Sequence, residues 1–153
     1  LRLGSVNPGE LAAAVVKELQ KYCHNKGLML VSSLNGSLPE MNLDRQRIAF
    51  ALRSLLENAI KFTPPGGTIS LDAQVRDDSV RLVVQDSGPG IPREELPKVF
   101  EKFYQVDPAR TGQVRGFGLG LYYARQFAQS HGGNILLECP PGGGTVATLI
   151  LPR

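Results

Sequence analysis

The residues with the clearest chemical potential form a polar row within residues 44–62. Ser54, Asn58 and Lys61 are spaced at i, i+4 and i+7, so on a helix they share one flank beside an apolar arc. An amide oxygen is a suitable neutral ligand for Mg²⁺, and a lysine ammonium reaches a phosphate as a point charge. A solvated helix face would show the same pattern, so the row indicates a phosphate site only if other features agree.

An acidic residue follows the predicted strand at residues 80–85. Asp86 comes directly after this apolar run, and two glycines, Gly88 and Gly90, follow at once. In an apolar pocket, a carboxylate here accepts a hydrogen bond from an exocyclic amine, which selects adenine because guanine presents a carbonyl at that position. The glycines would let a ligand approach closely. An ordinary turn explains the same glycines equally well.

Two further stretches complete the set. Residues 104–115 show no periodic pattern, and long stretches of this kind often form lids over ligands, with a passive surface loop as the alternative. Gly116, Gly118 and Gly120 then open a predicted helix, where free N–H groups and the helix dipole favour an anion. The four features, in this order, predict a nucleotide-binding site.

Several common motifs are absent from the sequence. The chain has no Gly-x-x-x-x-Gly-Lys-Ser/Thr phosphate loop, no dinucleotide-binding fingerprint directly after a strand and no serine nucleophile elbow. Its two cysteines and two histidines are scattered, which excludes a zinc site of ordinary spacing.

The elements that must position these residues can be predicted from capping and periodicity. Asn7 and Asp44 are the expected N-caps of two long helices. The predicted helices cover residues 8–27, 45–62 and 119–131, and the predicted strands cover residues 28–34, 68–75, 80–85, 135–138 and 145–151. About three helices and five strands, with two hairpins, predict an α+β fold: a two-layer α/β sandwich with a mixed five-stranded sheet.

Composition limits the class of protein. The chain has 153 residues, of which 42% are hydrophobic and 20% are charged, as expected for a single globular domain. No apolar run approaches the roughly 20 residues of a membrane helix. The net charge of +3 is too small to indicate a nucleic-acid partner. Because the chain starts at Leu1 and stops at Arg153 after a strand-like run, we expect residues 1–153 to be one domain excised from a longer protein.

Five segments resemble, in order, the sequence boxes of the sensor histidine kinase catalytic domain. They are residues 55–64 (LLENAIKFTP) for the N box, 86–91 (DSGPGI) for the first glycine box, 99–104 (VFEKFY) for the F box, 116–121 (GFGLGL) for the second glycine box and 143–145 for the terminal glycine-threonine element. The resemblance spans essentially the whole chain. It implies the Bergerat ATP-binding fold, which type II topoisomerases and heat-shock chaperones also use.

The resemblance also implies a role for each matching residue. Asn58 would bind Mg²⁺ and act with Lys61 in phosphoryl transfer, while Asp86 would read the adenine amine. Residues 105–115 would close over the nucleotide as a lid. The residues expected to contact or border bound ATP are Asn58, Lys61, Asp86, Gly88, Gly90, Ile91, Tyr104, Gly116, Gly118, Leu119 and Gly120.

The implied activity is that of a protein histidine kinase in a bacterial two-component phosphorelay. The domain would transfer the γ-phosphate of ATP to a histidine on a separate helical hairpin of the same kinase, and a response regulator would act downstream. His24 and His131 lie outside any acceptor motif, so the phosphoacceptor is expected elsewhere. The implied location is cytoplasmic, with no membrane or nucleic-acid contact by this domain, whether or not the parent protein is anchored in a membrane.

Three positions depart from the family pattern. Ser54 stands where many of these kinases have asparagine or histidine, Lys102 replaces the commoner arginine, and the neutral Gln105 replaces an arginine that can reach the γ-phosphate. Gln105 keeps open a degenerate nucleotide-binding regulatory module. An anti-sigma-type serine kinase is a further alternative, against which Ser54 argues because that family usually has a glutamate there.

Overall fold

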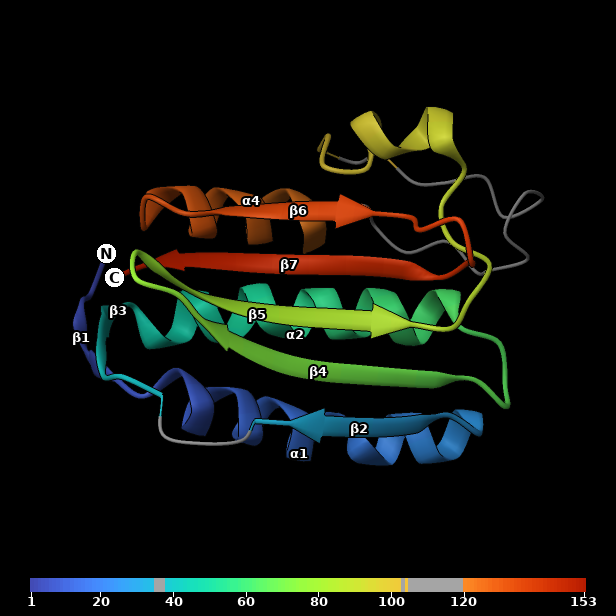
Figure 1. Ribbon diagram of the computed structural model, residues 1–153, viewed down its shortest axis with the longest axis horizontal. Coiled ribbons are helices and arrows are strands. Elements are labelled where there is room, and N and C mark those ends of the chain that lie inside the picture. Colours follow the sequence, from blue (N-terminus) through green and yellow to red (C-terminus); the bar gives the residue numbers. More distant parts are fainter. Residues whose placement is uncertain (35–37, 103, 105–119) are drawn as a thin grey trace.

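The computed structural model describes all residues except 35–37, 103 and 105–119. In the described part, a five-stranded sheet of order β2-β4-β5-β7-β6 forms one layer, and three α-helices cover one of its faces (Figure 1). The strands are β2 (Met29–Ser33), β4 (Thr68–Val75), β5 (Ser79–Asp86), β6 (Asn134–Glu138) and β7 (Thr145–Pro152). The helices are α1 (Pro8–Lys26), α2 (Arg45–Phe62) and α4 (Gly120–Ser130). The predicted α+β sandwich is confirmed.

The sheet is mixed, as the sequence predicted. β2 pairs with β4 in parallel, whereas β4 with β5, β5 with β7 and β6 with β7 are antiparallel. At the end of β5, Asp86 stands opposite Ile69 on one side and Thr145 on the other. β5 and α2 both end at the same end of the domain (Figure 1). Asp86 and the last turn of α2 therefore belong to one region.

Three short elements go beyond the sequence prediction. β1 (Gly4–Val6) and β3 (Met41–Leu43) form a separate antiparallel pair, and the 3₁₀-helix η1 (Arg93–Lys98) precedes the F box. A strand of three residues is too short to show an alternating pattern, and Pro97 within η1 breaks helical periodicity. Periodicity alone was therefore not sufficient to assign these elements, although residues 1–6, which contain β1, do alternate in the sequence.

Both long helices begin at the predicted caps. Oδ1 of Asn7 accepts hydrogen bonds from the backbone N–H groups of Gly9 and Glu10 at 2.8 and 3.1 Å. Oδ1 of Asp44 accepts a hydrogen bond from the backbone N–H of Arg47 at 3.2 Å. Each cap satisfies N–H groups that the first helical turn leaves unpaired.

Helix α2 lies between α1 and α4 and carries much of the core (Figure 1). The residues on its buried arc are at most 3% exposed: Ile48, Ala51, Leu52, Leu55, Leu56 and Ala59. They belong to one cluster with strand residues that are completely buried: Ile69, Leu71, Val80, Leu82, Leu149 and Leu151. Among the described residues, no helix has the length and apolarity needed to span a membrane.

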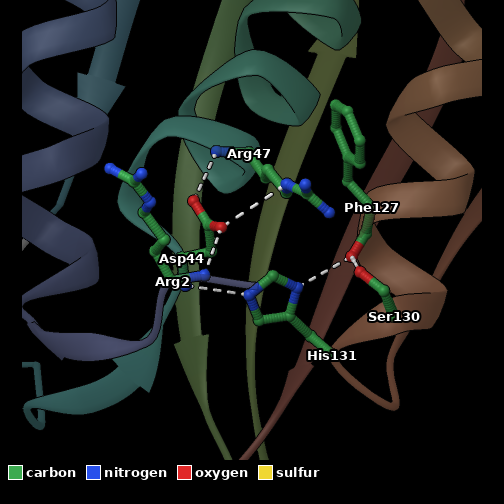
Figure 2. Close-up of polar contacts among 6 residues, drawn as sticks. All are labelled: Arg2, Asp44, Arg47, Phe127, Ser130 and His131. Atoms are coloured by element: carbon green, nitrogen blue, oxygen red, sulfur yellow. Dashed lines mark hydrogen bonds and ion pairs between the residues drawn. The ribbon is translucent and has the colours of Figure 1, made fainter.

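A hydrogen-bonded cluster joins the first residues, the start of α2 and the end of α4 (Figure 2). The backbone N–H of Asp44 donates to Nε2 of His131 at 2.9 Å, so Nε2 carries no proton. Nδ1 of His131 therefore carries the proton and donates it to the carbonyl oxygen of Phe127 at 2.8 Å. The backbone N–H of Arg2 donates to Oδ2 of Asp44 at 2.9 Å. His131 thus uses both ring nitrogens for hydrogen bonds inside the fold.

Replacing His131 by alanine removes one hydrogen bond from each of two backbone groups, although the carbonyl of Phe127 still accepts from Oγ of Ser130 at 2.7 Å. The N–H of Asp44, a residue only 6% exposed, and the carbonyl of Phe127 both lose a hydrogen bond. We expect the free energy of unfolding to fall by about 1–3 kcal/mol, measured by urea denaturation followed by circular dichroism. His24→Ala is the matched control, because His24 is exposed on α1, and its effect should stay below about 0.5 kcal/mol. Equal losses in the two variants would contradict this role of His131.

Candidate functional site

Helix α2 brings its polar row to the start of α4. Oγ of Ser54 lies 3.6 Å from the position that a Cβ on Gly120 would occupy, so the middle of α2 touches the N-terminus of α4. Asn58 and Lys61 follow Ser54 on α2, about one and two turns later, and both are partly buried. Ser54 of this row therefore lies beside the first residue of α4, and Asn58 and Lys61 lie further along α2.

Lys61 lies in the last turn of α2. Its Nζ is 5.5 Å from the ring centroid of Phe62, and burial lowers the pKa of the lysine. Because desolvation disfavours the isolated ammonium, an anion bound beside Lys61 would stabilise the charged form. Lys61 also lines a cavity of about 420 Å³ between α1 and α2, whose other lining residues are Glu18, Leu19, Tyr22, Arg53, Glu57 and Ile60.

Asp86 ends β5 and is 7% exposed. Its Oδ1 accepts hydrogen bonds from the backbone N–H groups of Gly88 at 2.9 Å and Thr145 at 3.3 Å. Burial raises the pKa of Asp86, and these two hydrogen bonds partly offset the rise. No hydrogen bond from the described residues reaches Oδ2. This second oxygen is the one available to a ligand.

An apolar cluster includes the loop that follows Asp86. Its buried members are Phe62, Ile91 and Val99, and the partly buried residues packed against them are Leu96, Phe100, Tyr104, Leu121, Leu137 and Cys139. The cluster joins the end of α2 to the loop, the F box, α4 and β6. Ile91 and Tyr104 were among the predicted site residues. Phe62 and Val99 were not, although both are visible in the sequence as apolar residues of the N and F boxes.

The backbone around Asp86 is packed so closely that two positions require glycine. A Cβ on Gly88 would lie 2.7 Å from the carbonyl oxygen of Phe62. A Cβ on Gly144 would overlap the carbonyl oxygen of Asp86, and the φ of Gly144 is left-handed at 81°. Gly90 lies beside Gly144, with its own Cβ position 3.0 Å from the Gly144 carbonyl oxygen. The loop between β6 and β7 therefore supports the loop after Asp86 directly.

The thiol of Cys139 joins the same two loops. The backbone N–H of Ile91 donates to Sγ at 3.3 Å, and Sγ lies 3.8 Å from Oγ1 of Thr145. Cys139 was not among the predicted site residues. The sequence contains no signal for it, because a single cysteine after a strand is ordinary.

Part of the predicted site lies outside the described residues. This part comprises Gln105, the expected lid at 105–115, Gly116, Gly118 and Leu119. Lys102 of the F box is described, and its Nζ lies 5.6 Å from the ring centroid of Tyr122 on α4. Within the described ranges, no group of three or more Asp, Glu, His and Cys side chains could hold a metal ion.

Known proteins resemble this chain in sequence. Residues 43–153 match the family of histidine kinase-, DNA gyrase B-, and HSP90-like ATPases. The sensor histidine kinase WalK of Bacillus subtilis is 39% identical over 122 residues, which make up 76% of this chain and 20% of WalK. The chain thus spans a fifth of the length of this relative.

Solved structures resemble it in fold. The nucleotide-free catalytic domain of histidine kinase ThkA has a TM-score of 0.87 at 27% identity and covers 100% of this chain and 99% of its own. ThkA in complex with the response regulator protein TrrA has a TM-score of 0.79 at 24% identity, over 99% of this chain and 42% of that one. Full-length ShkA in complex with AMPPNP has a TM-score of 0.87 at 29% identity, over 99% of this chain and 31% of ShkA.

Replacing Asp86 by asparagine is expected to stabilise the ligand-free domain at pH 7. The native state holds the Asp86 proton more tightly than the unfolded chain, because burial raises its pKa, so the ionised carboxylate reduces stability. Asparagine keeps an oxygen for the N–H groups of Gly88 and Thr145 and removes the charge.

The stabilisation should depend on pH. The stabilisation is fully present at pH values above the raised pKa of Asp86. It disappears as the pH falls toward the pKa of aspartate in the unfolded chain, about 3.9, because the wild-type carboxyl group is then protonated and neutral as well. Melting temperatures between pH 4 and pH 7.5 measure this trend. Asp77→Asn, in the exposed turn between β4 and β5, is the control. A stabilisation by Asp86→Asn that grows toward low pH would contradict the assignment.

Proposed function

The chain belongs to the family of histidine kinase-, DNA gyrase B-, and HSP90-like ATPases, and we propose that it is the ATP-binding catalytic domain of a sensor histidine kinase. In this function it transfers the γ-phosphate of ATP to a histidine on a separate helical hairpin of the same kinase. Residues 1–153 form one domain of that longer protein. The observation that carries the proposal is the buried carboxylate of Asp86, with one oxygen open to a ligand near an apolar cluster at the end of α2.

Asp86 is the proposed adenine-recognition residue. Two backbone N–H groups hold Oδ1, so Oδ2 is left to accept a hydrogen bond from the exocyclic amine of the base. Guanine carries a carbonyl oxygen at that position, and two acceptors facing each other both lose their partners. The apolar side chains of Phe62, Ile91 and Val99 suit the faces of a flat base. Gly88 and Gly90 allow the backbone to approach it.

The proposed phosphate-binding groups come from α2, α4 and the F box. Lys61 has a lowered pKa because of burial, so its charged form gains from a neighbouring phosphate. The N-terminus of α4 at Gly120 offers backbone N–H groups, and the second glycine box leads into it. Tyr104 belongs to the apolar cluster and is proposed to approach the nucleotide from the F box.

Asn58 is the proposed protein ligand of Mg²⁺. Its side chain is partly buried on α2, one turn after Ser54, whose hydroxyl is a second oxygen donor. Neutral oxygens of this kind fit Mg²⁺, which is commonly held by one or two side chains together with substrate phosphates. When bound with ATP, the ion supplies neutralisation of the charge on the transferred phosphoryl group.

The phosphoacceptor is proposed to lie on another part of the kinase. Both ring nitrogens of His131 are engaged inside the fold. His131 also follows the far end of α4, about 16 Å from Gly120 at 1.5 Å per residue. His24 is exposed on α1, in no acceptor motif. In-line attack needs a nucleophile roughly 3–3.5 Å from phosphorus. Because His131 lies at the opposite end of α4 from Gly120, it is too far away to attack.

The proposed partners follow from this activity. They are the phosphoacceptor hairpin and a response regulator, the class of protein with which ThkA forms its complex. The domain is proposed to work in the cytoplasm. A serine kinase or a degenerate nucleotide-binding module would give different outcomes in the experiments that follow.

Adenine nucleotides should bind in preference to guanine nucleotides, and Asp86 should be responsible. Asp86→Asn is expected to weaken ATP binding by about 1.5–3 kcal/mol, the scale of a hydrogen bond to a charged group. Isothermal titration calorimetry with Mg²⁺ and either ATP or GTP measures both effects. Asp77→Asn is the control, with unchanged affinity expected. Equal affinity for ATP and GTP in the wild type would refute the recognition of adenine by Asp86.

The domain should phosphorylate a supplied hairpin that carries the acceptor histidine, and it should not label itself. With γ-labelled ATP, we expect acid-labile label on the hairpin only. Transfer should be slow, because the covalent tether and its high effective concentration are missing. Asn58→Ala should abolish the label, whereas Asn42→Ala, at an exposed position of β3, should leave it unchanged.

Two other outcomes would favour the competing functions. Stoichiometric, acid-stable label on a serine of a partner protein would favour the serine kinase. Tight ATP binding without label on any cognate hairpin would favour the degenerate nucleotide-binding module.

A further inference from the structure

Lys26, in the last turn of α1, reaches across to the end of α2. Its Nζ donates to the carbonyl oxygens of Ile60 at 2.6 Å and Lys61 at 3.1 Å, across 34 and 35 positions of sequence. The side chain is partly buried, and burial lowers its pKa. An ammonium that donates to two carbonyl groups from a partly buried position has little freedom to move.

These two carbonyl groups have no partner within their own helix. The last four carbonyl groups of any α-helix lack an intrahelical N–H, and in α2 they belong to residues 59–62. The first of them, on Ala59, accepts from the backbone N–H and the Oγ1 of Thr63 at 3.0 and 2.7 Å. The last, on Phe62, packs against Gly88. Lys26 supplies the partner of the two in between.

We propose that Lys26 is a positioning residue for Lys61 in nucleotide binding. The inference rests on the proposed function, because it takes Lys61 as the residue that meets the phosphates of ATP. By holding the carbonyl groups of Ile60 and Lys61, Lys26 keeps the last turn of α2 wound. The backbone from which the Lys61 side chain starts therefore stays in one place.

Nucleotides with different numbers of phosphates separate this role from general support of the fold. AMP, ADP and ATP share the adenine that Asp86 is proposed to bind, and they differ in the phosphates that Lys61 is proposed to meet. Misplacement of Lys61 therefore weakens the binding of ATP more than the binding of AMP. General loosening of the domain weakens the binding of all three nucleotides to the same extent.

The test compares three variants by calorimetric titration with ATP, ADP and AMP in the presence of Mg²⁺. Lys26→Met removes the donor and its charge, and we expect ATP to bind about tenfold more weakly and AMP less than about twofold. Lys26→Arg keeps a charged donor and should stay within about threefold of the wild type for ATP. Lys21→Met, at an exposed position of α1, is the matched control and should bind like the wild type.

A double variant tests whether Lys26 acts through Lys61. In a Lys61→Met background, Lys26→Met should reduce the affinity for ATP by less than about a further twofold, because the lysine that Lys26 is proposed to position is already absent. A further tenfold loss there would overturn the proposal, as would equal losses for ATP and AMP in the single variant.

A replacement variant and the binding of the wild-type domain allow the result to be interpreted. If Lys26→Met does not fold, Lys26→Gln replaces it, because the shorter, neutral glutamine amide cannot replace the ammonium that holds both carbonyl groups, and the same difference between ATP and AMP is expected. A wild-type domain that binds none of the three nucleotides would refute the proposed function. Normal ATP binding by Lys26→Met would refute only the role of Lys26.

Discussion

The burial of one arc of α2 is the constraint on which the rest of the structure depends. Residues such as Ile48, Leu52 and Leu56 are completely buried against the sheet, so α2 cannot rotate about its axis without exposing them. A helix that cannot rotate presents its remaining flanks in fixed directions. The flank that carries Ser54 therefore meets the start of α4, and the last turn of α2 meets the loop after Asp86. Hydrophobic packing on one side thereby sets the polar geometry on the other.

The two ionisable groups of the candidate site are both held where their charged forms are disfavoured. Burial raises the pKa of Asp86 and lowers the pKa of Lys61. Neither residue relieves the other, since no ion pair between them is found among the described residues. A ligand that places an amine beside Asp86 and a phosphate beside Lys61 would stabilise the charged forms that burial disfavours. In the proposed function, an adenine nucleotide bound at both residues would offset the cost that their burial imposes on the stability of the free domain.

Residue types and spacing were sufficient to predict the long elements, whereas the roles assigned to the site residues stay predictions. Local signals, which involve residues close together in the chain, can be recognised in a single sequence. Examples are the caps at Asn7 and Asp44 and the apolar arc of α2. Lys26 and Cys139 left no such signal, because their partners are 34 and 48 positions away. A lysine in the last turn of a helix is common in any protein. Only the folded chain shows which carbonyl groups it reaches.

Both termini lie at one end of the domain, whereas β5 and α2 end at the other (Figure 1). A segment joined to either terminus would therefore attach at the end of the domain opposite the candidate site. The eight residues of β5 span about 27 Å, so tilting the domain by about 10° at the terminal end displaces the opposite end by roughly 5 Å. This displacement exceeds the separation of roughly 3–3.5 Å at which reacting atoms must meet. In the proposed function, a small change of tilt without internal rearrangement would therefore be enough to move a bound nucleotide into or out of reach of an acceptor.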